Sequence, residues 1–244
     1  MKNVQFLSNS TNIDKITKGL GLTRSLSVSS LLIGEAHTGK LSLVKNIFPN
    51  SVYVDAQNES ELYTALDANH ELIIYNFHKV KNIENLNFEN KRIIAISDSL
   101  KEKQKLSKTF AFMYEMPNLR EREDLNKIIA YFQKEIKKDL MIEADIQLDS
   151  TKLDLSQNIK SLKASIYKEL TLQTFKKEDI QALLYNYLFK EMEGNNAYRE
   201  HLALYEEPLI QAGLKKYKSQ LKLAGVLGLN RNTLRKKIQE YDIN

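Results

Sequence analysis

The chain has 244 residues, 42% hydrophobic and 27% charged, which suits a globular protein with one large or two small domains. The absence of cysteine excludes disulfides and thiolate metal sites, and no apolar run is long enough to span a membrane. The start of the chain lacks a signal-peptide pattern, so we predict a cytoplasmic protein with no membrane partner. The histidines show no metal-ligand spacing, so we predict no metal site; they are His37, His70, His78 and His201.

The formal net charge of +5 is distributed unevenly. Residues 195–244 contain nine Lys and Arg residues against five Asp and Glu residues, whereas residues 1–194 contain 27 against 26. The electrostatic attraction to phosphate is therefore concentrated at the carboxyl-terminal end. The larger amino-terminal part has little net charge with which to bind nucleic acid.

Residues 27 to 111 follow an α/β pattern. Short apolar runs separated by helical stretches indicate buried strands of a parallel sheet. The predicted strands lie within residues 28–33, 52–54, 72–75 and 92–96.

After the first predicted strand comes Gly34-Glu35-Ala36-His37-Thr38-Gly39-Lys40-Leu41, followed by a predicted helix. Two glycines at this spacing before a lysine predict a phosphate-binding loop, in which backbone N–H groups and a helix N-terminus face the phosphates. The usual Ser or Thr ligand of magnesium is replaced by Leu41. We predict no obligatory cofactor, but the loop leaves ATP binding open, with contacts from Gly34, Ala36, His37, Thr38, Gly39 and Lys40. The alternative is a plain strand-turn-helix connection.

From residue 119 onward, apolar residues recur at helical spacing. The predicted helices cover residues 125–136, 159–172, 177–192, 197–205 and 209–217. Pro208 suits the first turn of the last of these, where its missing N–H costs nothing. Residues 193–196 are the best candidate for a linker.

Residues 220–238 predict two helices joined by a tight turn, with an apolar seam between them made by Leu223, Leu227, Leu234 and Ile238. Ala224 is small where the helices would cross. Gly228 is placed where the first helix must end in a left-handed residue, and Asn230 can cap the second helix. This is the layout of a helix-turn-helix whose second helix enters the DNA major groove.

Polar residues near the start of that second helix are the predicted contacts to double-stranded DNA: Asn230, Arg231, Asn232, Thr233, Arg235 and Lys236. The alternative is an amphipathic hairpin with a solvated basic face. Residues 198–244 resemble the Fis-type DNA-binding domain, whose signature matches residues 228–238 and whose second helix begins like residues 205–210. The resemblance implies a homodimer that reads a pseudo-palindromic site. We predict that residues 197–205 and 209–217 hold it together.

Three further segments resemble the AAA+ domain of NtrC-type enhancer-binding proteins, the bacterial activators of sigma-54 RNA polymerase. Residues 6–40 resemble its start, residues 91–97 the strand before its first sensor, and residues 116–124 its Leu-Pro-Pro-Leu-Arg-Glu-Arg segment. The resemblance implies an α/β AAA+-like P-loop module with a helical lid, followed by an all-α Fis-type helix-turn-helix domain. RNA polymerase is a further partner that this resemblance allows.

Other positions depart from that family's ATPase machinery. Its catalytic Asp-Glu pair corresponds to Tyr75 and Asn76, and neither can act as a base or bind magnesium as a carboxylate does. Lys108 stands nearest to the position of the arginine finger, and Lys160 matches the second-sensor arginine. The sigma-contacting Gly-Ala-Phe-Thr-Gly-Ala hairpin is absent, because residues 40–193 contain no glycine. We therefore predict no catalytic residues.

The sequence favours a sequence-specific transcriptional regulator without ATP hydrolysis. Its predicted parts are a degenerate AAA+-like module (residues 1–115), a helical lid (116–193) and a Fis-type dimerisation and DNA-binding domain (194–244). One alternative is a P-loop ATPase that activates sigma-54 RNA polymerase. Another is a nucleoid protein that bends DNA with little sequence preference.

Overall fold

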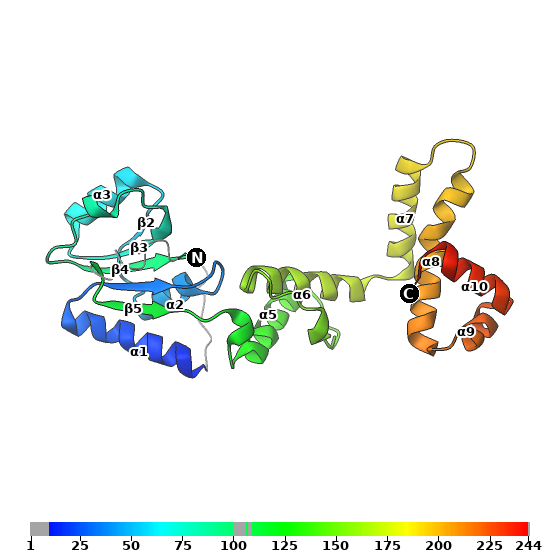
Figure 1. The fold of residues 1–244 in the computed structure, drawn as a ribbon, viewed down its shortest axis with the longest axis horizontal. Helices are drawn as coiled ribbons and strands as arrows, with labels where there is room; N and C mark the ends of the chain where they lie inside the picture. The colour runs from blue at the N-terminus through cyan, green and yellow to red at the C-terminus, as the bar shows by residue number, and fades with distance from the viewer. Residues whose placement is uncertain (1–9, 100–105, 107–108, 244) are drawn as a thin grey trace. The chain divides into compact units, whose positions relative to one another are not determined.

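The computed structural model describes residues 10–99, 106 and 109–243 (Figure 1). The chain divides into two compact units, Met1–Thr174 and Phe175–Asn244. The first holds a parallel sheet and a pair of lid helices, and the second consists of helices. Two parts of the resemblance to the AAA+ domain lie outside the described residues. They are Lys108, near the position of the arginine finger, and residues 6–9 at the start of the domain.

The first unit is built on five parallel strands in the order β2-β3-β4-β1-β5. The strands are β1 (Ser30–Ile33), β2 (Tyr53–Asp55), β3 (Glu71–Tyr75), β4 (Arg92–Ser97) and β5 (Phe112–Glu115). Every residue of β1 and β4 is buried, as expected for central strands covered on both faces. The predicted parallel sheet is therefore confirmed.

Helices cover both faces of this sheet (Figure 1). They are α1 (Thr11–Leu26), α2 (Lys40–Ile47) and α3 (Glu59–Ala68). Successive residues of β1 point to opposite faces. Leu32 belongs to the core cluster that contains Leu20 of α1 and Val44 of α2, whereas Leu31 belongs to the cluster that contains Leu62 of α3. The result is a sheet between two helical layers.

The lid follows β5. Its helices are α5 (Leu125–Asp139) and α6 (Ile159–Thr174), and the short 3-10 turns of the unit are η1 (Phe77–Lys79), η2 (Ile83–Asn85), η3 (Leu119–Glu121) and η4 (Ser150–Lys152). Ile128 and Ile136 of α5 pack with Leu162 and Ile166 of α6 in a core of their own. The helical spacing over residues 125–136 and 159–172 therefore reflects this packing.

The second unit contains α7 (Lys177–Glu191), α8 (Ala197–Tyr217), α9 (Gln220–Leu227) and α10 (Arg231–Glu240). Its core joins the last three helices and consists of Ile210, Leu223, Ala224, Leu234 and Ile238. No residue of α7 is buried. The ring of Tyr187 on α7 meets His201 on α8 edge-on, with centroids 6.2 Å apart.

Three features differ from the sequence-based expectation. Neither α1 nor the edge strand β5 was assigned. The two helices predicted over residues 197–217 are one, so Pro208 lies inside a helix and not in a first turn. Its missing N–H leaves one carbonyl of the preceding turn without the usual donor.

No helix of the described residues is both long and apolar enough to traverse a membrane.

Candidate nucleic-acid interface and nucleotide loop

The turn between α9 and α10 has the predicted geometry. Gly228 follows the last residue of α9 with a φ of 66°, in the left-handed region. The N–H of Leu229 then donates to the carbonyl oxygen of Ala224 at 2.9 Å, which satisfies a group that the helix end leaves free. Asn230 caps α10, because its side-chain oxygen accepts from the N–H of Asn232 at 2.9 Å.

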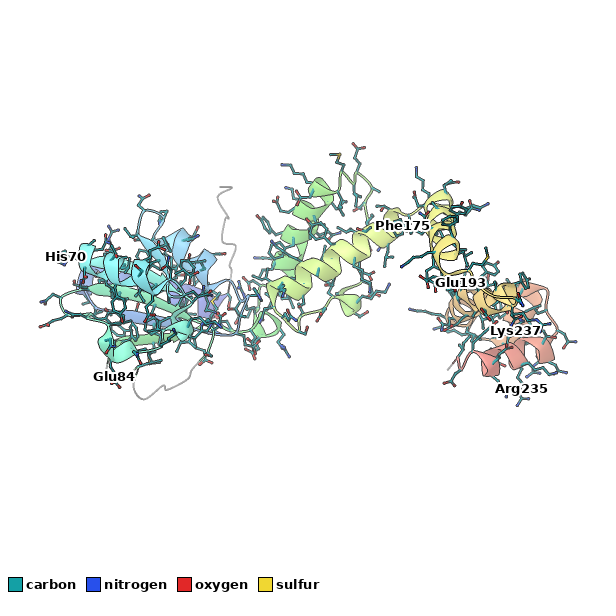
Figure 2. The ribbon with its side chains drawn as sticks, turned by 90° about the horizontal axis from the view of Figure 1, so that it is seen from above. His70, Glu84, Phe175, Glu193, Arg235 and Lys237 are labelled. Atoms are coloured by element: carbon teal, nitrogen blue, oxygen red, sulfur yellow. The ribbon has the colours of Figure 1, made fainter. Side chains whose placement is uncertain are left out.

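The two faces of α10 differ in character. Leu234 and Ile238 are buried and pack against Ile210 of α8 and Leu223 of α9. The predicted DNA contacts all lie on the exposed part: Asn230, Arg231, Asn232, Thr233, Arg235 and Lys236. Figure 2 shows Arg235 at the outer edge of its unit. This arrangement leaves α10 free to lie in a major groove.

The helices α8 and α9 cross closely at Gly213. A Cβ atom at this position would lie 2.3 Å from Cδ1 of Leu223, which is itself buried in the core. An alanine here would therefore force the side chain of Leu223 to shift. No role was predicted for Gly213 from the sequence, although a glycine inside a helical pattern is a known signal of close packing.

A polar cluster joins α8 to the carboxyl-terminal half of α10. Nζ of Lys237 lies 2.5 Å from Oε2 of Glu206, and the hydroxyl of Tyr241 donates to the same oxygen at 2.6 Å. These bonds lower the pKa of Glu206, with that from Lys237 contributing most. The bond to Glu206 raises the pKa of Tyr241 to about 12. We call these three residues the Glu206 cluster.

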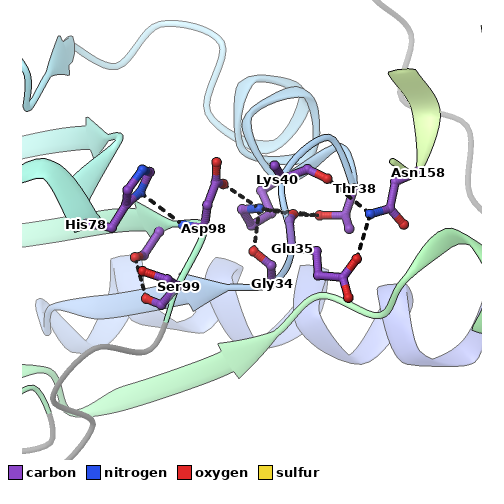
Figure 3. Close-up of polar contacts among 10 residues, drawn as sticks. Gly34, Glu35, Thr38, Lys40, His78, Asp98, Ser99 and Asn158 are labelled. Carbon is purple, nitrogen blue, oxygen red and sulfur yellow. Dashed lines mark hydrogen bonds and ion pairs between the residues drawn. The ribbon is translucent and has the colours of Figure 1, made fainter. Parts of the chain in front are cut away.

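Lys40, at the start of α2, is held by acceptors of the chain itself (Figure 3). Its ammonium group donates to the carbonyl oxygens of Gly34 at 2.8 Å and Glu35 at 2.5 Å, and it lies 2.8 Å from Oδ1 of Asp98. Burial lowers the pKa of Lys40, and the carboxylate of Asp98 opposes that shift. Lys40 is only 4% exposed, so its charge is well shielded from water.

The loop is also bonded to the lid. The side-chain nitrogen of Asn158, just before α6, donates to Oε2 of Glu35 and to the carbonyl oxygen of Ala36, both at 3.1 Å (Figure 3). The N–H of Ile159 donates to the carbonyl oxygen of His37 at 3.1 Å. The loop and the first turn of α6 are therefore held together.

A cavity of about 310 Å³ lies beside the loop. It is lined by His37, Gly39, Lys40, Leu41, Ser42, Tyr75, Asn76, Ile96, Asp98, Ile159 and Lys160. Tyr75 and Asn76 stand at the end of β3, and Nδ2 of Asn76 donates to Oδ1 of Asp55 at 2.9 Å. The carboxylate that lines this cavity comes instead from Asp98, after β4.

The predicted nucleotide contacts do not all lie in this cavity. His37, Gly39 and Lys40 line it, whereas Gly34 lines a second cavity of about 490 Å³, and the hydroxyl of buried Thr38 donates to the loop itself. Asp98 was not among the residues predicted from the sequence. The available signal was its place directly after a strand, at the carboxyl edge of the sheet where ligands bind in α/β folds.

Residues 202–241 match the family described as bacterial regulatory protein, Fis family. The chain is 37% identical over 71 residues to the DNA-binding protein Fis of Aliivibrio fischeri (strain MJ11). The matching region covers 28% of this chain and 72% of that protein. The chain belongs to the Fis family of bacterial regulatory proteins. The DNA-binding protein Fis of Aliivibrio salmonicida (strain LFI1238) matches to the same extent. The helix-turn-helix of the second unit is therefore of the Fis type.

Nearly the whole chain also shares its fold with NtrX from Brucella abortus. The crystal structure of NtrX in complex with ATP matches with a TM-score of 0.52 at 14% identity, over 98% of this chain and 69% of NtrX. The complex with ADP matches with a TM-score of 0.50 at 17% identity, over the same shares. The predicted fold, an AAA+-like α/β module followed by an all-helical Fis-type unit, is confirmed.

Proposed function

We propose that this chain is a sequence-specific DNA-binding transcriptional regulator of the bacterial enhancer-binding type. The observation that carries the proposal is α10, a capped helix with a buried apolar seam and a polar outer face. Arg231, Arg235 and Lys236 can neutralise phosphates or read guanine, and Asn232 and Thr233 can hydrogen-bond to base edges. The Fis relatives are named as DNA-binding proteins, which supports the same reading.

We also propose a homodimer, held by α7 and the outer face of α8. Ile180, Leu183 and Phe189 on α7 are 57%, 55% and 77% exposed, an apolar surface that a second copy would cover. The surface differs from the one expected from sequence, because Ile210 belongs to the core of its own unit and Leu214 packs against it. Two copies would present two α10 helices to half-sites about one helical turn apart.

The phosphate loop is proposed to hold ATP or ADP without hydrolysis. NtrX, which shares the fold, was crystallised with both nucleotides. Lys40 and the backbone of residues 36–39 would hold the phosphates. Leu41 has no hydroxyl group for magnesium, and Tyr75 and Asn76 supply no carboxylate, so we expect weak dependence on magnesium and no activated water.

An ATPase is the second candidate, and Asp98 favours it by placing a carboxylate in the cavity. The test is phosphate release by the full chain with ATP and magnesium. Release at background level supports the proposal. Steady release that Lys40→Ala abolishes would establish the ATPase and overturn our non-hydrolytic assignment.

The experiment that tests the main proposal is selection of bound DNA from a random pool by the full chain. We expect enrichment of one pseudo-palindromic sequence, which then stays bound in the presence of excess mixed-sequence DNA. Binding without enrichment would favour a nucleoid protein. If the chain retains no DNA at low salt, both the sequence-specific regulator and the nucleoid protein are excluded.

A further inference from the structure

We infer that Glu206 is a positioning residue for DNA recognition, which holds the carboxyl-terminal half of α10 against α8 and keeps Lys237 away from DNA phosphates. The inference rests on the proposed DNA-binding function. Lys237 then has a different role from Arg235 and Lys236, which precede it directly in the sequence.

The position of Lys237 on the helix explains the difference. Successive residues of an α-helix point about 100° apart, so three consecutive basic residues cannot all face the same partner. Arg235 and Lys236 are exposed, whereas Lys237 precedes buried Ile238 on the flank of the core, and its side chain is 23% exposed.

The Glu206 cluster supplies a constraint that the apolar seam does not. Leu234 and Ile238 pack by non-directional contacts, which tolerate small rotations of α10 about its axis. Lys237 and Tyr241 are one helical turn apart and both bond the same carboxylate oxygen of Glu206. Two directional bonds from successive turns fix the rotation of α10 relative to α8. The face that α10 presents to a groove therefore depends on Glu206.

The ion pair also removes Lys237 from the set of phosphate contacts. A lysine that neutralises a phosphate releases a counterion, and the slope of log affinity against log salt then changes by about one. Because the charge of Lys237 is already paired with Glu206, we expect it to contribute nothing to that slope.

The test is a salt titration of binding by the full chain to a mixed-sequence DNA duplex. Lys236→Ala is the matched control and should reduce the slope by about one per protomer. Lys237→Ala should leave the slope unchanged. Glu206→Ala should increase it by about one, because Lys237 is released, and adding Lys237→Ala to that variant should restore the parent slope.

Positioning is tested by the ratio of affinities for the selected duplex and the mixed-sequence duplex. Glu206→Ala should lower this ratio at least tenfold, and the exchanged pair Glu206→Lys with Lys237→Glu should recover most of it. If Glu206 only stabilised the fold, Glu206→Ala would leave the salt slope unchanged.

Either of two results would overturn the inference alone: Lys237→Ala reduces the slope as Lys236→Ala does, or Glu206→Ala keeps both the parent slope and the parent ratio. A parent chain that binds neither duplex would instead overturn the proposed function, and the inference with it.

Discussion

Lys40 and Asp98 form an ion pair at the loop that is proposed to bind nucleotide. Their 2.8 Å contact places a carboxylate beside the ammonium that would otherwise bind phosphate. An incoming phosphate must displace Asp98 and approach its negative charge. We therefore predict that Asp98→Asn strengthens binding of ATP or ADP, measured by calorimetry on the full chain, by about fivefold or more, since removal of a like charge at ~4 Å is worth about 1 kcal/mol even in bulk water.

The matched control for that prediction is Asp55→Asn. Asp55 ends β2 and bonds Asn76, not Lys40, so its substitution should leave nucleotide affinity nearly unchanged. Lys40→Ala should abolish binding. Equal effects of the two aspartate variants would contradict a specific role for Asp98, and heat of binding retained by Lys40→Ala would place the nucleotide elsewhere.

The residues that sequence alone could predict are those whose roles depend on near neighbours. Gly228 and Asn230 act on groups within a few residues, so their pattern is visible in the sequence. Asp98 and Glu206 have their partners 58 and 31 residues away, at Lys40 and Lys237. Such pairs depend on the strand order and on the crossing of helices, which composition and spacing do not supply.

The close crossing of α8 and α9 gives a prediction at the scale of elements. Gly213→Ala would place a Cβ atom against Leu223, and overpacking of a core typically costs about 1–3 kcal/mol. We expect a loss of that size in the free energy of unfolding, measured by denaturant titration of the full chain with circular dichroism.

Gly225→Ala on α9 is the control for that crossing. No atom lies within 4 Å of a Cβ atom built there, so the better helix propensity of alanine should stabilise the chain by up to about 1 kcal/mol. If Gly213→Ala is as stable as the parent, Leu223 can move aside and the crossing does not require glycine.

The Glu206 cluster predicts a dependence of stability on pH. The pKa of Glu206 is lowered below its ordinary value of 4.5 in the folded chain, so its contribution is fully present above that value and is lost as pH falls through the lowered pKa. Thermal unfolding measured from neutral pH to about pH 3 should show a smaller loss of Tm for Glu206→Gln than for the parent. Parallel curves for the two proteins would contradict this assignment.

Elements were predictable where burial imposes a clear pattern. The central strands β1 and β4 are buried throughout and read as continuous apolar runs. The edge strand β5 is exposed or half-buried, so it lacks that signal. Pro208 favours a break between two predicted helices, because proline normally begins or ends a helix, whereas α8 continues through it.

For the whole molecule, the exposed apolar surface of α7 predicts self-association. We expect a dimeric mass by sedimentation at micromolar concentration, and a shift to monomer for Phe189→Glu, because a buried charge would oppose the contact. Leu22→Glu, at a 61% exposed position on α1, should remain dimeric. A parent chain that sediments as a monomer would refute the dimer.

The central claim is that the exposed face of α10 binds DNA, and the most direct measurement is a salt titration of DNA binding by the parent and by Arg235→Ala. We predict a loss of about 1–3 kcal/mol if Arg235 reads a base, or a salt slope lower by about one if it binds a phosphate. Gln239→Ala, an exposed uncharged position on the same helix, should bind like the parent. An Arg235→Ala variant that binds as tightly as the parent, with the same slope across the titration, would contradict the claim.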